Sequence, residues 1–394
     1  MKILFSHSHV IYKGGWGRTF PFAEELVKQG HEVTIITMAN KMTLKISLLK
    51  INGVKIVTFP SLLPIKNYYD PISILLKVIY VLFHSYDIVH SDIGQRPQSG
   101  LPCRISKRLK GTTYISDWMD YNAQGGQYET KSKFFKLLMG NYELKWEFKD
   151  RVYADGVIVL SDLLYKKAIE IRNDLNVVKI HGGSLVDKIP YIEDNSALKL
   201  KLGININEIT FGYIDQSVSS LIEIQPLIDA INGLESFTNY KILIFGGSKR
   251  KDDESIKSIY SNVIQLGWVD FYKEYEKLLA VDIFVLFKTD DLVSKSGWPN
   301  ALGDYLACGR PVIIKPIGET VDFVKKYSEG FYTVEDPNSL KNILNQLYVD
   351  RVTIKQKGKV NRILAEEVIS WENKAKELSN FYEEINNRKK FNSN

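Results

Sequence analysis

The segment from Asp282 to Ile314 reads DIFVLFKTDDLVSKSGWPNALGDYLACGRPVII. Its apolar start, Asp282–Phe287, predicts a buried strand. Helix-forming residues without a breaker run from Ala301 to Ala307, and Gly309 then ends the predicted helix. A second strand begins at Pro311. The order strand, glycine-containing loop, helix and strand indicates a βαβ unit, and therefore a parallel α/β sheet.

The loop and the start of this helix have the properties of a phosphate site. Backbone N–H groups at a helix N-terminus, together with the positive end of the helix dipole, favour bound phosphate. Asp304 lies about one turn into the helix, where a carboxylate can accept hydrogen bonds from the two hydroxyls of a ribose. The alternative is an ordinary βαβ turn with a surface aspartate, and the spacing alone leaves both readings open.

Residues 298–311, WPNALGDYLACGRP, resemble the family 4 retaining glycosyltransferases, and most of all a branch that reads W-P-N-K-x-x-D-Y-x-A-x-G-R-P. The resemblance implies the GT-B fold, with two Rossmann-like, doubly wound α/β domains that face a central cleft. It places the carboxylate that binds the donor ribose at Asp304, where the family has Glu. Ser296 replaces the first Glu of the family's E-x7-E motif. Ala301 replaces the branch's Lys, and Lys295 is the candidate to supply the missing charge.

Length and composition agree with two globular domains. The chain has 394 residues, of which 44% are hydrophobic and 25% charged, enough for two separate cores. A net charge of +6 suits anionic ligands or an anionic membrane surface and is no nucleic-acid signature by itself. The two cysteines, Cys103 and Cys308, predict neither a disulfide framework nor a metal cluster. The N-terminus becomes polar too early for a signal peptide, so we expect a cytoplasmic protein.

The first half begins with another βαβ unit. Lys2–Ser6 and His31–Thr37 read as strands, and between them lie a glycine-rich loop and a helix that Gly30 ends. The loop matches the G-G-x-x-R opening of the family. The resemblance implies that Gly14 and Gly15 approach the donor phosphates or the acceptor, with Arg18 nearby. In the alternative reading, these glycines only shape the turn.

Two carboxylates follow a later strand of this half. Thr113–Ser116 reads as a strand that runs into Asp117 and Asp120. Ligands of open α/β sheets bind beyond the carboxyl ends of the strands, and the family often has a His or Asp at this point. The resemblance therefore gives the catalytic role first to Asp117 and second to Asp120, with Arg18 completing the catalytic set. A pair of helix-capping aspartates is the alternative.

The segment from Lys131 to Arg151 is a helical pattern in which lysines alternate with aromatic and aliphatic residues. A basic amphipathic helix of this kind can lie on an anionic membrane. The alternative is a core helix with solvated lysines. The longest apolar run, Ile72–Phe83, contains Lys77 and is too short to span a bilayer.

The sharpest departure from the family lies at the start of the second half. Tyr213 stands where the family has the Arg that neutralises the donor diphosphate, and residues 216–225 contain no Lys or Arg. Gly267 and Trp268 match the segment that holds the nucleobase, and Glu319 follows in a glycine loop. The complete set of predicted donor-binding residues is Gly14, Gly15, Gly246, Gly267, Trp268, Lys295, Ser296, Gly297, Trp298, Pro299, Asn300, Asp304 and Glu319.

These observations predict an acceptor-side domain at residues 1–188, joined by a C-terminal helix at about 368–394, and a donor domain at 189–367. The predicted activity is transfer of a sugar from a nucleotide-sugar donor to an acceptor hydroxyl with retention, in the synthesis of a cell-surface polysaccharide or glycolipid. The acceptor is a glycan or a lipid-linked sugar, and the enzyme is cytoplasmic or peripheral on the inner membrane face. No metal, further cofactor or nucleic acid is expected.

Two alternatives stay open. The missing Arg and Lys favour a catalytically weak GT-B subunit that binds a partner glycosyltransferase or a glycan. The second alternative is a sugar-nucleotide epimerase.

Overall fold

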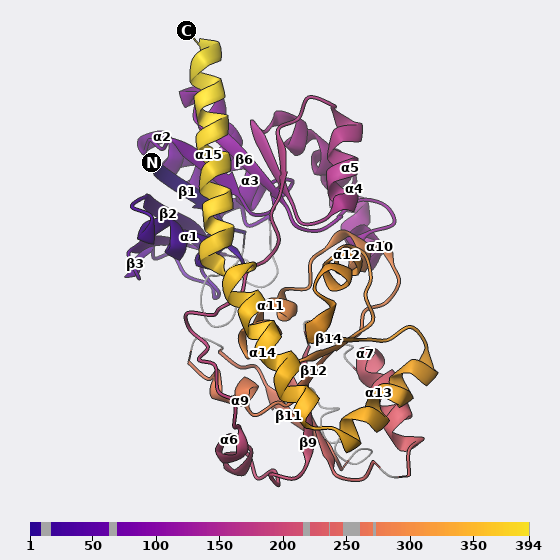
Figure 1. Cartoon of the computed structure of the whole chain (residues 1–394). Coiled ribbons are helices and arrows are strands. Elements are labelled where there is room, and N and C mark those ends of the chain that lie inside the picture. Colours follow the sequence, from indigo (N-terminus) through magenta and orange to yellow (C-terminus); the bar gives the residue numbers. More distant parts are fainter. Residues whose placement is uncertain are drawn as a thin grey trace. The chain divides into compact units, whose positions relative to one another are not determined.

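The computed structural model describes residues 1–8, 17–62, 69–215, 221–235, 237–246, 261–270 and 273–393 (Figure 1). The chain divides into two compact units. The first unit comprises Met1–Gly182, Asp291–Trp298 and Trp371–Asn394, and the second comprises Gly183–Asp290 and Pro299–Ser370. The sequence predicted a single donor domain at 189–367. Unlike that prediction, the division assigns Asp291–Trp298 to the first unit.

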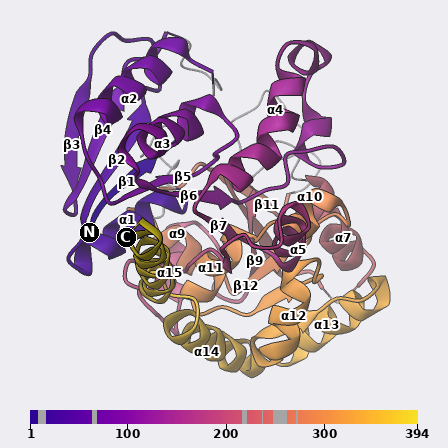
Figure 2. The ribbon, with the colours of Figure 1, turned by 90° about the horizontal axis from the view of Figure 1, so that it is seen from above.

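The described residues of the first unit form an eight-stranded sheet in the order β3-β4-β2-β1-β5-β6-β7-β8. Its strands pair in parallel, except that β3 is antiparallel to β4. Figure 2 shows β3, β4, β2 and β1 side by side at one edge. The strands are β1 (Lys2–Ser6), β2 (Glu32–Met38), β3 (Ser47–Ile51), β4 (Val54–Phe59), β5 (Ile88–Ser91), β6 (Thr113–Trp118), β7 (Gly156–Val159) and β8 (Val177–Lys179).

Helices cover this sheet on both faces, as expected when parallel strands alternate with crossover helices. The C-terminal helix belongs to this unit, because its buried Tyr382 hydrogen-bonds to His90 Nδ1 of β5 and Ser379 Oγ lies 3.0 Å from His31 Nε2. The helices are α1 (Thr19–Lys28), α2 (Pro71–Phe83), α3 (Pro97–Lys110), α4 (Lys133–Tyr153), α5 (Asp162–Ile171), α10 (Leu292–Ser296) and α15 (Trp371–Ser393).

The described residues of the second unit form a six-stranded parallel sheet in the order β11-β10-β9-β12-β13-β14. The strand order reverses between β9 and β12, the point where open α/β sheets bind ligands. The strands are β9 (Ile209–Asp215), β10 (Tyr240–Gly246), β11 (Val263–Gly267), β12 (Ile283–Leu286), β13 (Val312–Ile314) and β14 (Phe331–Thr333). The helices are α6 (Ser196–Lys201), α7 (Leu221–Asn232), α9 (Glu276–Leu279), α11 (Asn300–Ala307), α12 (Glu319–Lys326), α13 (Pro337–Val349) and α14 (Val352–Glu367).

The predicted α/β class with two doubly wound sheets is confirmed. Each sheet has its own apolar core, built in the first unit from residues such as Ile36 and Val89 and in the second from residues such as Phe211 and Val285. Within the part of the chain that the structure describes, no helix is both long enough and apolar enough to cross a bilayer. Nor do the described His, Cys, Asp and Glu side chains gather into a group of three or more that can hold a metal ion.

Candidate functional site

Helix α11 is fixed at the point where the strand order of the second sheet reverses. The backbone N–H of Ile214 in β9 donates to the hydroxyl of Tyr305, 2.8 Å away. The ring of Tyr305 stacks on Phe284 of β12, with ring centroids 4.1 Å apart. Gly309, at φ +63°, ends the helix in the left-handed conformation that favours glycine. These contacts hold α11 against β9 and β12.

Asp304 lies next to Tyr305 on this helix. Its side chain is half-buried, and burial raises the pKa of the carboxyl from 3.8 to about 7. Among the described residues, no hydrogen bond or ion pair reaches the Asp304 carboxyl. Because a desolvated carboxyl without donors is costly, this position suits a ligand that supplies hydroxyl donors.

A cation lies beside the residue that replaces the family's arginine. Tyr213 is buried, and its hydroxyl donates to Glu223 in the first turn of α7. The same carboxylate binds Lys288, whose Nζ lies 3.1 Å from Oε1 and 3.0 Å from Oε2. Lys288 follows β12, so this charge also lies at the carboxyl ends of the strands. The sequence analysis missed Lys288 as a site residue because it read the residue as part of a polar loop.

A cavity of about 630 Å³ in the second unit contains this ion pair. Glu223, Lys288 and Lys315 line it together with residues of α7 and α13, two helices that lie side by side in Figure 1. Its volume is in the range of small-molecule sites. The second unit therefore has a ligand-sized space at the carboxyl ends of β12, β13 and β14.

Other predicted donor residues lie at the same edge of the second sheet. Gly246 ends β10 at φ +88°, and Gly267 ends β11 at φ +66°. The exposed Trp268 follows Gly267, and Glu319 begins α12. The structure therefore brings these four residues to the carboxyl ends of the strands, as it does Asp304. Gly14 and Gly15 lie outside the described residues.

The first unit holds an ion pair between Arg18 and Asp117. Arg18 Nε lies 3.3 Å from Asp117 Oδ2, and a second guanidinium nitrogen donates to the carbonyl oxygen of Ile180 at 3.0 Å. His90 Nε2 lies 3.7 Å from the same carboxylate oxygen. We predicted that Asp117 lies in a loop beyond the strand. This placement is wrong, because β6 continues to Trp118 and Asp117 is 2% exposed. The positive charge of Arg18 offsets the cost of burying this carboxylate.

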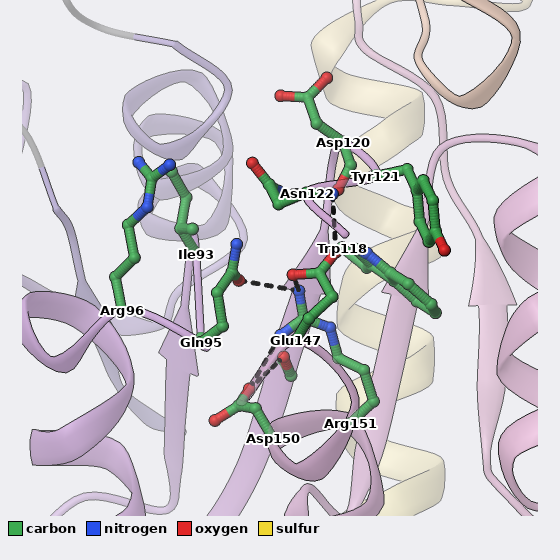
Figure 3. A network of polar contacts seen from close by, with 12 residues as sticks. Ile93, Gln95, Arg96, Trp118, Asp120, Tyr121, Asn122, Glu147, Asp150 and Arg151 are labelled. Atoms are coloured by element: carbon green, nitrogen blue, oxygen red, sulfur yellow. Dashed lines mark hydrogen bonds and ion pairs between the residues drawn. The ribbon is translucent and has the colours of Figure 1, made fainter. Parts of the chain in front are cut away.

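Asp120 lies beyond the end of β6, at the carboxyl edge of the first sheet. It is half-buried, and burial raises the pKa of its carboxyl, an effect that nearby Arg96 opposes. Figure 3 shows Asp120, Asn122 and Arg96 around the ends of β5 and β6. Of the two predicted carboxylates, Asp120 is therefore the more exposed one and the one that lies beyond the end of the strand.

A buried network below Asp120 fixes the loop that carries it (Figure 3). Glu147 of α4 accepts hydrogen bonds from Trp118 Nε1 at 2.9 Å and from the backbone N–H of Asn122 at 2.8 Å. Arg151, one turn further along α4, donates to Gln95 Oε1 at 3.0 Å. These contacts couple α4 to the ends of β5 and β6. Sequence reasoning missed this network, because its members are distant in the chain.

The predicted loop at Lys295–Trp298 is instead a short helix and its exit, and both belong to the first unit. Asp291 caps α10 by accepting from the N–H of Ser294 at 2.8 Å. The carbonyl oxygen of Ser296 accepts from Ser161 Oγ at 2.7 Å. A Cβ added to Gly297 would lie 3.6 Å from Asp120 Oδ1. This segment therefore lies beside Asp120.

The predicted donor set is consequently divided between the units. The ring of Trp298 stacks on His181, with centroids 4.2 Å apart, whereas Lys295 is exposed. Pro299, Asn300 and Asp304 belong to the second unit. The chain passes from one unit to the other between Trp298 and Pro299.

Residues 212–350 match the family described as "Glycosyl transferases group 1". The matched residues form a group 1 glycosyltransferase domain. The match begins at β9, includes Tyr213, Lys288 and Asp304, and ends just after α13. No curated protein matches this glycosyltransferase.

Solved structures share the fold over almost the whole chain. A sucrose-phosphate synthase from Thermosynechococcus elongatus is 16% identical, with 98% of each chain covered and a TM-score of 0.70. Anabaena HepE in complex with UDP is 15% identical, with 96% of this chain and 99% of that chain covered and a TM-score of 0.66. WaaG, a glycosyltransferase involved in lipopolysaccharide biosynthesis, is 13% identical, with 96% and 98% covered and a TM-score of 0.64. The GT-B fold of this glycosyltransferase is thereby confirmed.

Proposed function

We propose that this glycosyltransferase moves a sugar from a nucleotide-sugar donor to an acceptor hydroxyl with retention, and that its second unit binds the donor. The observation that carries the proposal is Asp304, a half-buried carboxyl without a described partner at the reversal point of the sheet. Its carboxylate accepts hydrogen bonds from the ribose hydroxyls. The solved complexes of HepE with UDP and with UDP-glucose support a nucleotide-sugar donor.

The roles of the other predicted donor-binding residues follow from their positions along the same edge of the second sheet. The backbone at Gly267 and Trp268 holds the nucleobase, and the turns at Gly246 and Glu319 approach the phosphates. Exposed Trp268 offers an aromatic face to the base. Pro299 and Asn300 begin α11, whose N-terminal amides favour an anionic group.

Lys288 supplies the charge that Tyr213 does not. Two of its three N–H donors are directed at the two oxygens of Glu223, which leaves the third for a phosphate oxygen. Glu223 thereby positions the ammonium group at the carboxyl ends of the strands. A cation at this place stabilises the charge that develops on the leaving diphosphate. Lys295, the candidate from the sequence, is retained as a second cation, on the first unit.

In the first unit, Asp120 acts on the acceptor hydroxyl, and Gly297 lies beside it. Arg18 and Asp117 were the other two predicted catalytic residues. We now propose that they position the end of β6 instead. Their mutual ion pair and deep burial support this division of roles.

The exposed face of α4 supports a peripheral membrane location and a lipid-linked acceptor. Phe134, Leu137 and Leu138 are 62% to 82% exposed. The acidic residues of the helix, in contrast, are all buried, and its exposed charges are lysines. The buried acids are Glu143, Glu147 and Asp150, and the exposed lysines are Lys133, Lys145 and Lys149. Such a face suits an anionic bilayer surface.

A thermal-shift screen over nucleoside diphosphates and nucleotide sugars tests the proposal, because a ligand that binds only the folded state raises its stability. We expect one nucleotide series to raise the melting temperature, and its sugar-bearing member to be consumed when the correct acceptor is added. Binding without turnover on any acceptor would favour the non-catalytic subunit. Conversion of the donor to an isomeric nucleotide sugar would favour the epimerase. No shift with any nucleotide would contradict the proposal.

A further inference from the structure

Edge strand β3 and the segment that leads into it expose four large apolar side chains. Met42, Leu44, Ile46 and Leu48 are 56% to 75% exposed. None of them enters the core of the first unit, and the proposed transfer reaction uses none of them. Single exposed apolar residues are normal on protein surfaces, but a group of this size marks a site of interaction.

The pairing of β3 with β4 places Leu48 beside α2. Leu48 is the direct partner of Val57 in the antiparallel pair, so the two side chains lie on the same face of the sheet. On that face, Val57 and Phe59 pack with Val81 and with Tyr80 of α2, whose ring centroid lies 5.6 Å from that of Phe59. Helix α2 therefore lies over β4, and Leu48 lies beside it.

Helix α2 exposes a second group of apolar side chains. Leu75, Ile79, Leu82 and Phe83 are 39% to 82% exposed. Their spacing of four, three and one residues puts them on one side of the helix. In contrast, Lys77 of the same helix is fully buried and donates to the carbonyl oxygens of His7 and Gln98 at 2.7 and 3.1 Å. The β3–α2 surface is the set Met42, Leu44, Ile46, Leu48, Leu75, Ile79, Leu82 and Phe83.

The exposed charges of the chain segment that carries the β3–α2 surface have one sign. Between residues 33 and 86 the sequence contains a single acidic residue, Asp70. That residue is fully buried, where it accepts from Ser61 Oγ, the N–H of Leu62 and the N–H of Ser73. Lys41, Lys45 and Lys50 are exposed. The surface therefore combines apolar side chains with a cationic border.

We propose that the β3–α2 surface docks on an anionic lipid bilayer, as a contact separate from the face of α4. The apolar side chains enter the boundary between head groups and acyl chains, and the lysines bind the lipid phosphates. A second copy of the chain fits this surface less well. Lysines along an edge strand oppose pairing with another strand, and a symmetric contact would bring equal charges together. The inference extends the membrane location of the proposed function.

Flotation of the full chain with liposomes tests the proposal. The liposomes are phosphatidylcholine alone or phosphatidylcholine with 30% phosphatidylglycerol, at low and high salt. We expect binding to the anionic liposomes only, weakened by salt because exposed charges are screened within about 10 Å at 0.1 M. The double variants Leu44→Ser/Leu48→Ser and Ile79→Ser/Phe83→Ser are each expected to lower partitioning roughly tenfold, since each removes apolar area that would enter the bilayer.

The matched control is Val349→Ser in the second unit, which changes a side chain that is 84% exposed. It should float like the unaltered chain, and all variants should keep their melting temperatures. Unchanged flotation of both double variants, while changes at Phe134 and Leu137 abolish it, would overturn the inference and leave the α4 contact intact. Equal binding to neutral liposomes, no binding at all, or a shift from dimer to monomer in the double variants would also overturn it. The nucleotide screen is independent of these outcomes.

Discussion

Lys288 Nζ lies 3.0 Å from Glu223 Oε2, and the hydroxyl of Tyr213 donates to the same carboxylate. The ion pair joins the end of β12 to the first turn of α7. The family has an arginine where this chain has Tyr213. The ion pair places the ammonium group of Lys288 beside this position.

Changing Lys288 should therefore weaken binding of a nucleoside diphosphate more than binding of the uncharged nucleoside. Charge-assisted hydrogen bonds contribute roughly 1.5–3 kcal/mol, so Lys288→Ala should cost roughly ten- to 150-fold in affinity for the diphosphate. Lys288→Arg should retain most of it. Lys315→Ala removes a lysine from the same cavity and is the matched control. Equal losses for nucleoside and diphosphate in calorimetry would exclude the phosphate contact.

Substitution of Asp120 should lower activity, whereas substitution of Asp117 should lower stability. Asp120→Asn should lower kcat at least tenfold with a small change in melting temperature, because the side chain is half-buried at the edge of the sheet. Asp117→Asn breaks the pair with Arg18 and leaves a buried guanidinium without its counter-charge, so a loss of roughly 3–5 kcal/mol of stability is expected. Turnover assays and chemical denaturation of both variants measure these effects. The reverse pattern would return the catalytic role to Asp117.

The stability of the protein should depend on pH through Asp304. Burial raises the pKa of this carboxyl from 3.8 to about 7. Between these values the folded state holds a proton that the unfolded state has lost, so the contribution of Asp304 to stability falls as pH rises from about 4 to 7. Asp304→Asn removes this dependence. The variant should therefore gain stability relative to the unaltered chain between pH 5 and pH 8, in urea denaturation. If the free energy of unfolding changes with pH in the same way in Asp304→Asn and in the unaltered chain, the raised pKa of Asp304 is contradicted.

The exposed face of α4 should contribute to membrane binding independently of the β3–α2 surface. Phe134→Ser/Leu137→Ser should lower flotation with anionic liposomes without changing the melting temperature, because both side chains are exposed. Turnover on a water-soluble acceptor fragment should be unaffected. A lower melting temperature would instead show that these residues stabilise the fold.

The parts of the fold that sequence predicted are those with strong local signals. The apolar runs of β1 and β12, and the glycines that end α1 and α11, predicted two βαβ units, and both formed. The position of Asp304 about one turn into α11 was likewise predicted, since it depends on one loop and one helix turn. These features depend on residues that are neighbours in the chain.

The remainder depends on distant partners. Asp117 continues β6 because Arg18, about a hundred positions earlier, neutralises it. Helix α4 turns its acids inward because arginines such as Arg96 and Arg104 meet Glu143 and Asp150 there. Asp291–Trp298 packs with the first unit through Ser161. These pairs join residues that are far apart in the chain, so the spacing of residues within one segment could not predict them.

The central claim is that Asp304 binds the ribose of the donor. Calorimetric titration of the unaltered chain, Asp304→Ala and Asp304→Glu, with a nucleoside diphosphate and with the nucleoside alone, tests it most directly. The account predicts a loss of roughly ten- to 150-fold for Asp304→Ala, equal for both ligands, from hydrogen bonds worth roughly 1.5–3 kcal/mol. Asp304→Glu, which restores the family's residue, should be milder. Unchanged affinity and an unchanged melting temperature in Asp304→Ala would contradict the claim.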